Sequence, residues 1–368
     1  MGLLDDTYTL FLRELLIFKK NIGMNLGRAT VFPLLFVLLL GSFGSAPRNV
    51  PIAVVNYASG PAALNFINIL QSGSSVNIVS QTTQQQAMSL LSSSSVAAVV
   101  VIPSGFSTGL GSQSTVHVYL DNSQPQSAEV ASAQVNAAAA QVNDPATSAA
   151  PVSVITNYAY GASSNYISFV IGGILVMVAS FGAVFSAGFT VISDRQLGNL
   201  KAFLTTPINS FSVLLSKILY GTFQSVFSAY VGLIIGLLYG ATIAAGLAGF
   251  IELIWIIFLV GLGFGSLAIA LAARMKDLQT YALIGQTLVL PLSFLGGAFV
   301  PTTLLPKFLL PVAAVDPLTY AVNAVRDIMI KGSLPLTTLI STSIILLAFS
   351  SIMVGLAYIF FKDTSKQI

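Results

Sequence analysis

Six stretches of this sequence are long and almost wholly apolar, and they constrain the fold more than any other feature. They lie at about residues 28–45, 165–192, 209–240, 247–273, 278–300 and 337–361. About 20 apolar residues are enough for a helix to cross a bilayer. Soluble domains carry roughly 25% charged residues, whereas this chain carries 7% and is 55% hydrophobic. The sequence therefore predicts an all-α polytopic membrane protein with six transmembrane helices, the first at 28–46 and the others within 164–361.

The distribution of Lys and Arg predicts how these helices are oriented. If the N-terminus is in the cytoplasm, eleven Lys and Arg fall on the cytoplasmic side and four on the outer side. Such an excess on the cytoplasmic side is typical of membrane proteins. We therefore expect a multi-pass protein of the cell (plasma) membrane with both termini in the cytoplasm and a cytoplasmic tail at 362–368.

Residues 1–27 carry the pattern of an amphipathic helix. Apolar side chains recur at helical spacing, at Leu4, Tyr8, Phe11, Leu15 and Phe18. The polar face has Arg13, Glu14, Lys19 and Lys20. This pattern predicts a helix lying in the inner membrane interface. The alternative is a simple cytosolic leader.

The segment 47–163 is polar but almost free of charge. Its β-branched runs predict strands at 51–56, 76–80, 96–103 and 114–121. Helices are predicted at 61–72, 82–92 and 126–142. This alternation predicts an inserted α/β domain, which the orientation above makes extracellular. The single histidine, His117, alternates with apolar residues in the last predicted strand, so we expect a strand surface residue rather than a metal ligand.

The sequence also excludes several classes of function. It has no cysteine and one histidine, so it offers no plausible nucleophile and base, and it has no G-x-x-x-x-G-K-[ST] loop for phosphates. The apolar stretches lack the ionisable groups that ion carriers need at membrane depth. Lys217, near a helix end, is expected to snorkel to the inner surface. We expect no enzyme, no cofactor and no nucleic-acid binding in this chain, and an energy source in a separate polypeptide.

Three stretches carry a resemblance to a known family. "SDRQLGNLKAFLTTPINSFSVLLSKIL", which begins at Ser193, resembles the loop after the second transmembrane helix of type-2 ABC exporter permeases. "FLGGAFVPTTLLPKFLLPVAAVDPLTYAVNAVRDIMIKG" (294–332) is similar to the signature of the same family before its sixth helix. "VPIAVVNYASG" and "AAVVVIPSGFSTGL" look like the extracellular domain of the subgroup in which a large domain follows the first span.

The resemblance implies a cytoplasmic coupling helix at 194–206 that contacts a partner ATPase. Its residues would be Asp194, Arg195, Leu197, Gly198, Leu200, Phe203, Thr206 and Pro207. Asp194 or Ser193 could cap this helix and Pro207 would end it. ATP and Mg would bind in the ATP-binding cassette subunit, and the permease would form a homodimer or pair with a paralogue.

The resemblance also implies an outer re-entrant segment at 301–335. Its motif residues are Pro301, Pro306, Asp316, Pro317, Tyr320 and Arg326. The segment is too rich in proline for a span and too apolar for a solvated loop, so two short half-helices in the membrane lipid are expected. Asp316 should cap the second of them, with Pro317 in its first position. Arg326 and Asp327 either pair across the assembly or solvate the outer rim.

The function that these features imply is that of the membrane-spanning permease subunit of an ATP-driven exporter. Because the spans carry so little charge, the substrate should be hydrophobic or amphipathic, such as a drug, a lipid or a lipid-linked compound. One alternative is a permease for polysaccharide or glycolipid export. Another is a force-transmitting or surface-anchored protein without a transport path.

Overall fold

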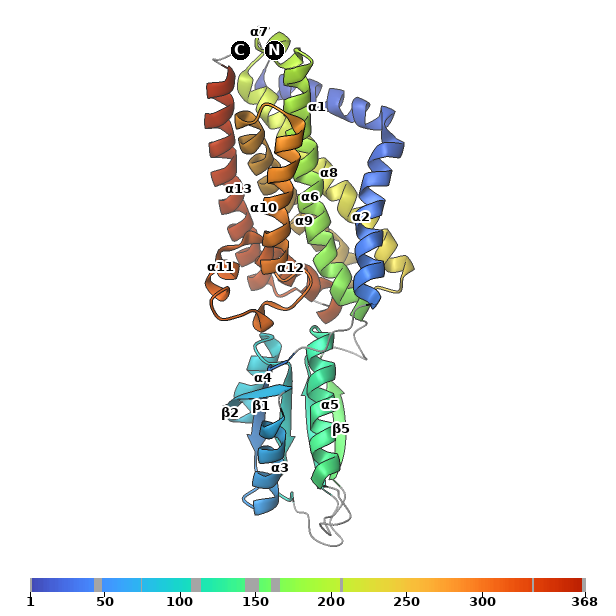
Figure 1. Cartoon of the computed structure of the whole chain (residues 1–368), viewed down its shortest axis with the longest axis vertical. Helices are drawn as coiled ribbons and strands as arrows, with labels where there is room; N and C mark the ends of the chain where they lie inside the picture. Colours follow the sequence, from blue (N-terminus) through green and yellow to red (C-terminus); the bar gives the residue numbers. More distant parts are fainter. Residues whose placement is uncertain are drawn as a thin grey trace. The chain divides into compact units, whose positions relative to one another are not determined.

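The chain forms two compact units (Figure 1). We call residues 1–41 and 170–368 the helical unit, and residues 42–169 the α/β unit. A computed structural model describes residues 2–42, 48–73, 75–106, 114–142, 152–159, 166–205, 208–332 and 334–365. The α/β unit is an insertion, because the chain leaves the helical unit after residue 41 and returns to it at residue 170.

The helical unit consists of long apolar helices with one irregular connection. It begins with α1 (Leu3–Lys20), α2 (Ile22–Ser42), α6 (Tyr166–Gln196), α7 (Asn199–Thr205) and α8 (Ser210–Leu238). It continues with α9 (Gly246–Arg274), α10 (Leu278–Leu295) and, last, α13 (Leu336–Ser365). The connection before α13 contains η2 (Thr302–Leu304), α11 (Leu310–Val315), α12 (Pro317–Arg326) and the π-helical turn η3 (Asp327–Lys331).

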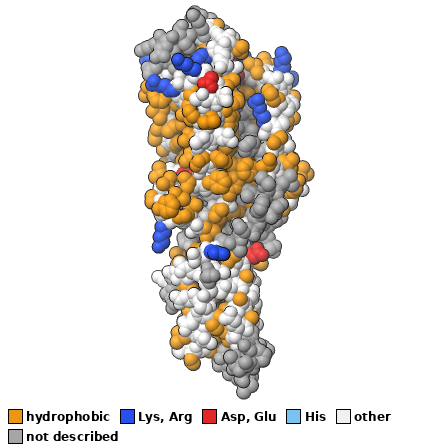
Figure 2. All heavy atoms as spheres, viewed as in Figure 1, with side chains coloured by type: hydrophobic (Ala, Val, Ile, Leu, Met, Phe, Trp, Pro, Cys, Tyr) orange, Lys and Arg blue, Asp and Glu red, His pale blue; other side chains and the backbone are white. Residues whose placement is uncertain are grey.

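Five helices in the described part of the chain are long and apolar enough to cross a membrane: α6, α8, α9, α10 and α13. They correspond to five of the six predicted spans. Within α2, the apolar helical segment Ile22–Phe36 is shorter than these five helices, so the first predicted span stays a prediction. Hydrophobic side chains cover much of the visible surface of the helical unit (Figure 2). This surface is consistent with a lipid environment.

Glycines allow the helices of this unit to pack closely. A Cβ atom at Gly173 of α6 would lie 1.8 Å from the carbonyl oxygen of Ala298. A Cβ atom at Gly261 of α9 would lie 2.7 Å from the Cβ of Ser225 in α8. Helices in lipid associate through such close backbone approaches, since no hydrophobic driving force acts between them. These positions therefore fix how α6, α8 and α9 lie within the unit.

The α/β unit is built on a five-stranded sheet with the order β2-β1-β3-β4-β5. The strands are β1 (Val50–Asn56), β2 (Val76–Gln81), β3 (Ala98–Ile102), β4 (Ser114–Leu120) and β5 (Val152–Tyr158). β1 pairs in parallel with β2 and with β3. β4 pairs antiparallel with β3 and parallel with β5.

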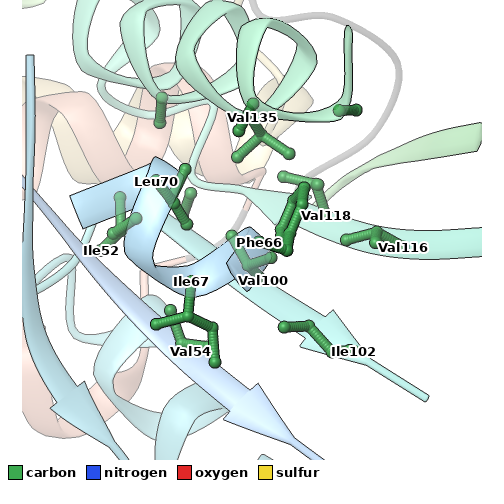
Figure 3. Packing of buried hydrophobic residues seen from close by; sticks show 14 of the residues in the cluster. Ile52, Val54, Phe66, Ile67, Leu70, Val100, Ile102, Val116, Val118 and Val135 are labelled. Atoms are coloured by element: carbon green, nitrogen blue, oxygen red, sulfur yellow. The ribbon is translucent and has the colours of Figure 1, made fainter. Parts of the chain in front are cut away.

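Helices cover both faces of this sheet. On one face, Val100 and Val118 pack with Phe66 of α3 (Pro61–Ser72) and Val135 of α5 (Pro125–Val142), and all four are buried (Figure 3). On the other face, strand residues pack against Leu91 of α4 (Gln84–Ser92). Because β3 is buried on both faces, its sequence is an unbroken apolar run rather than an alternating one.

The sequence patterns anticipated most of this unit. The four predicted strands and three predicted helices are present, with small differences at their ends. β5 was not predicted, because its alternation of apolar and polar residues is short. The strand it pairs with, β4, is separated from it in the sequence by α5. His117 lies in β4 opposite Val101 and is half-buried, which confirms its place in a strand.

Candidate functional site

Four charged side chains from three helices form one cluster. Arg13 and Glu14 belong to α1, Asp194 to the end of α6, and Lys217 to α8. Lys217 Nζ donates to Glu14 Oε1 at 3.1 Å and to Asp194 Oδ2 at 2.5 Å. The Arg13 guanidinium donates to Glu14 Oε1 at 2.9 Å and to Asp194 Oδ1 at 3.0 Å. We call these four residues the ion-pair cluster.

Burial makes the members of this cluster interdependent. The side chains of Lys217, Glu14 and Asp194 are 2%, 5% and 7% exposed, and that of Arg13 is 32% exposed. An ion buried without a partner costs several kcal/mol, but here two cations face two carboxylates. The cluster therefore links α1, α6 and α8 by charges that cannot be separated without a large cost.

The position of Lys217 differs from its sequence prediction. It does not snorkel to a surface, because its ammonium is enclosed by carboxylates from two other helices. Glu14, which was placed on the exposed polar face of α1, is buried. Sequence reasoning missed Glu14 as a site residue. The available signal was the lysine inside an apolar helix, because a buried ammonium requires a carboxylate partner.

The connection between α6 and α8 contains the residues predicted to form a coupling helix. α6 continues through Gln196, a turn follows at Leu197 and Gly198, and α7 begins at Asn199. Gly198 has a φ of +77°, a backbone conformation that favours glycine. The predicted start of the coupling helix at 194 is therefore wrong. Asp194 lies inside α6, and its carboxylate binds the cluster instead of capping a new helix.

Two contacts join α7 to the ion-pair cluster. Asn199 Nδ2 donates to Asp194 Oδ1 at 3.1 Å. The guanidinium carbon of Arg13 lies 5.1 Å from the ring centre of Phe203, within the range of a cation–π interaction. Leu200 is buried, whereas Leu197 in the preceding turn is 72% exposed. α7 is thus anchored on one side, and the turn before it exposes an apolar side chain.

Arg195 joins the same connection to a fourth helix. Its guanidinium donates to the carbonyl oxygens of Met275 at 2.6 Å and Ala273 at 3.3 Å. These carbonyls lie at the C-terminal end of α9, where backbone oxygens lack partners within the helix and a cation is favoured. Thr206 and Pro207 lie outside the described residues, so their predicted role stays a prediction.

The second group of predicted residues lies in the connection between α10 and α13. As predicted, Asp316 caps α12, because its Oδ1 accepts the backbone N–H of Leu318 at 2.9 Å and Pro317 occupies the first helical position. The Tyr320 hydroxyl donates to the carbonyl oxygen of Ala314 in α11 at 2.8 Å. The two short helices predicted for this segment are therefore present and are tied to each other.

The remaining residues of this group have structural positions. Pro301 precedes η2, and Pro306 lies between η2 and α11. Arg326 is buried and donates to the carbonyl oxygen of Ala298 at 3.1 Å. Because Arg326 is buried, the alternative in which it solvates the outer rim is wrong. Gly172 of α6 leaves room for the Arg326 side chain, since a Cβ at Gly172 would lie 3.1 Å from Arg326 Cγ.

The acidic groups of the site are already paired with cations. No group of three or more His, Cys, Asp and Glu that could hold a metal ion occurs among the residues that the structure describes. The two carboxylates of the ion-pair cluster are both occupied by cations. The cluster therefore joins three helices through paired charges, and neither of its carboxylates is free of a cation.

Comparisons with known proteins identify the family. The putative transport permease ycf38 of Cyanophora paradoxa is 32% identical over 196 residues, 52% of this chain and 64% of that protein, so the match spans less than two thirds of that relative. The probable multidrug ABC transporter permease YbhR of Escherichia coli K12 is 21% identical over 315 residues, 82% of this chain and 84% of that protein. ABC transporter G family member 20 of Dictyostelium discoideum is 21% identical over 332 residues, 85% of this chain and 44% of that protein.

A family model also matches most of the chain. Residues 29–359 match the family described as "ABC-2 family transporter protein". This range takes in α6 to α12 and the α/β unit, together with most of α2 and α13. Because the match covers most of the chain, this protein belongs to the ABC-2 family of transporter proteins.

Proposed function

We propose that this chain is the membrane-spanning permease subunit of an ATP-driven exporter for hydrophobic or amphipathic compounds, and that α7 receives the movement of the ATPase. The observation that carries this proposal is the contact of α7 with the ion-pair cluster through Asn199 and Phe203. A short helix with one anchored side, preceded by a turn with an exposed leucine, suits the docking of a partner on a membrane protein.

The partner follows from the family. Permeases of the ABC-2 family are not enzymes themselves and work with separate ABC ATPase subunits. In the proposal, ATP and Mg bind in the ATPase, and two permease copies, or one copy and a paralogue, complete the transporter. The exposed Leu197 and the outer side of α7 then form the surface that meets the ATPase.

The proposed orientation places α7 in the cytoplasm and the α/β unit outside the cell. α7, α1 and the C-terminal end of α13 lie at the same end of the helical unit (Figure 1). Lys19, Lys20, Lys276 and Lys362 belong to the segments at this end. An excess of basic residues marks the cytoplasmic side of membrane proteins, which supports this assignment.

The proposed mechanism follows from the ion-pair cluster. A push on α7 reaches Asp194 through Asn199 and reaches Arg13 through Phe203. Because the cluster is buried and every charge in it is paired, its members move together rather than separate. The movement is therefore passed to α1, α6 and α8 at once, and the helices shift as packed bodies.

The proposed substrate class rests on the composition of the spans. Among Lys, Arg, Asp and Glu, the five long apolar helices carry only the following residues, each within eight residues of a helix end: Asp194, Arg195, Lys217, Glu252, Arg274, Lys362 and Asp363. A path with so few charges does not replace the hydration shell of an ionic solute. The relative YbhR is described as a probable multidrug permease, which agrees with a hydrophobic or amphipathic substrate here.

The experiment that tests the proposal compares two exposed leucines. Leu197 precedes α7 and is 72% exposed, and Leu247 lies at the start of α9, beyond the other end of α8, and is 80% exposed. Leu197→Asp should abolish both co-purification of an ABC ATPase and ATP-dependent loss of a dye from proteoliposomes. Leu247→Asp should leave both unchanged.

Two results would contradict the proposal. One is a wild-type chain that yields no ATPase on purification from its own cells and no ATP-dependent dye loss. The other is a Leu197→Asp variant that binds its ATPase like the wild type. Because Leu200 is buried, a substitution there would disturb the fold as well as the surface, and Leu197 gives the cleaner test.

A further inference from the structure

The helical unit contains a cavity of about 550 Å³ between α2, α6 and α8. Such a volume lies within the range of about 300–1,000 Å³ that is typical of small-molecule sites. The lining residues of α2 lie close to its start, the part of the helix that follows α1. None of the residues of the ion-pair cluster lines it. The cavity is therefore a separate feature.

One wall of the cavity is aromatic. Phe181, Phe185 and Phe189 lie one turn apart on α6, with ring centres 5.7 Å and 5.6 Å apart along the row. Val178 extends the same wall by nearly one turn. A row of side chains of this length presents a continuous apolar surface. It suits a hydrocarbon chain better than a compact polar ligand.

The α2 and α8 sides of the cavity include polar side chains and a positive charge. Asn25 of α2 and Gln224 of α8 line the cavity, and both are buried. Gln224 Nε2 donates to Asn25 Oδ1 at 3.5 Å and to the Tyr220 hydroxyl at 3.3 Å. Both amides are neutral, and Asn25 Nδ2 also donates to the carbonyl oxygen of Phe18 at 3.3 Å. The positive charge among the lining residues comes from Arg28.

Arg28 is not neutralised by the residues that the structure describes. Its guanidinium donates to the sulfur of Met24 at 3.6 Å, and it has no carboxylate partner among those residues. It lies fewer than two turns from the start of α2. A basic group between helices near the membrane surface attracts acidic lipid headgroups. The cavity thus combines a cationic side chain with an apolar wall.

We propose that this cavity binds an amphiphile with an anionic headgroup. The headgroup lies at Arg28, beside Asn25 and Gln224, and the hydrocarbon chain lies along Phe181, Phe185 and Phe189. Two sources have this chemistry: an acidic phospholipid of the surrounding bilayer, or a compound that the protein exports. The binding itself does not depend on the proposed transport function.

Two glycines of α2 provide a matched pair of variants. A Cβ atom at Gly27 or at Gly23 would meet no other atom within 4 Å, so either position accepts a larger side chain. Gly27 lines the cavity, whereas Gly23 does not. Gly27→Leu therefore fills the cavity, and Gly23→Leu changes the same helix without doing so. Arg28→Ala removes the charge, and Lys20→Ala removes an exposed charge of α1 as its control.

The measurement is binding of phosphatidylglycerol and phosphatidylcholine to the full chain in detergent, by native mass spectrometry. The wild type should prefer phosphatidylglycerol. Arg28→Ala should weaken its binding about fivefold with little effect on phosphatidylcholine, and Gly27→Leu should remove both lipids. Gly23→Leu and Lys20→Ala should bind like the wild type. Equal binding of the two lipids by the wild type, or unchanged binding by Gly27→Leu, would overturn the proposal.

A second arm distinguishes the two sources. The chain with its ATPase is loaded with phosphatidylglycerol and given ATP and Mg. If the wild type loses the lipid, the site is part of the export path. If it retains the lipid, the ligand is a bound lipid of the bilayer. Both results support an anionic amphiphile as the ligand. A transporter that moves no dye would contradict the proposed function but would leave the lipid-binding result unaffected, so the two failures can be told apart.

Discussion

Lys217 Nζ lies 3.1 Å from Glu14 Oε1, although 203 residues separate them in the chain. The pair brings the first helix of the protein against α8, and Asp194 at the end of α6 completes the same group. A lysine in an apolar helix is tolerated here because it contacts two carboxylates, Glu14 and Asp194. Arg13 contacts the same two carboxylates and balances their second charge. The predictions below begin with this relationship.

Removing Lys217 should destabilise the helical unit strongly. Lys217→Met leaves two buried carboxylates with one guanidinium, and breaking a buried ion pair in this way costs about 3–5 kcal/mol. Denaturant unfolding of the purified chain in detergent measures the loss. Lys19→Met, at an exposed position of α1, should change stability very little. A Lys217→Met variant as stable as Lys19→Met would show that the cluster contributes nothing.

A second substitution should restore part of this stability. In the double variant Glu14→Gln with Lys217→Met, one carboxylate and one guanidinium remain, so the charges balance again. Residues in one network show coupling energies of about 0.5–3 kcal/mol. The double variant should therefore be more stable than Lys217→Met alone. Strictly additive losses, found by the same unfolding measurement, would argue that the two side chains act independently.

Asp316 should make stability depend on pH. Burial raises the pKa of its carboxyl to about 7, although the N–H of Leu318 opposes this shift. A carboxyl whose folded pKa lies above the unfolded value of about 3.9 binds its proton more tightly in the folded state. Its contribution to stability therefore falls as pH rises from about 4 to 7. Melting temperatures across this range should fall for the wild type relative to Asp316→Asn, which keeps the cap but does not titrate.

Two glycines should respond in opposite ways to alanine. A Cβ at Gly173 would lie 1.8 Å from the carbonyl oxygen of Ala298, so Gly173→Ala must push α6 away from that backbone. Overpacking of this kind costs about 1–3 kcal/mol or more. A Cβ at Gly355 of α13 meets nothing within 4 Å, and alanine there favours the helix by up to about 1 kcal/mol. Thermal melts of the two variants should move in opposite directions, and equal shifts would contradict this packing.

The α/β unit should fold on its own. Its sheet and three helices form one compact unit with its own core. Residues 48–159 expressed alone should give a cooperative thermal melt. Phe66→Ala in that core should cost about 3–5 kcal/mol, whereas Leu64→Ala, at a 58% exposed position, should cost far less. A random-coil circular dichroism spectrum of the isolated segment would rule this out.

The fold elements were largely predictable because their signals are local. A run of apolar residues predicts a spanning helix wherever it occurs, and α6, α8, α9, α10 and α13 follow from such runs. The alternation of β-branched runs and helical patterns predicted β1 to β4 in the same way. The cap of α12 by Asp316 needs only the next two residues.

What the sequence determined by itself is therefore the set of elements and the nonpolar character of their surroundings. Which helix faces meet was decided only in the tertiary structure. The burial of Glu14 beside Lys217, the inward turn of Arg326 and the cavity at Arg28 all depend on it. A charged side chain on an amphipathic or apolar helix has the same local pattern whether it faces solvent or a partner. Only the packing of segments far apart in the chain distinguishes the two, because the energy of a buried charge depends on what lies opposite it.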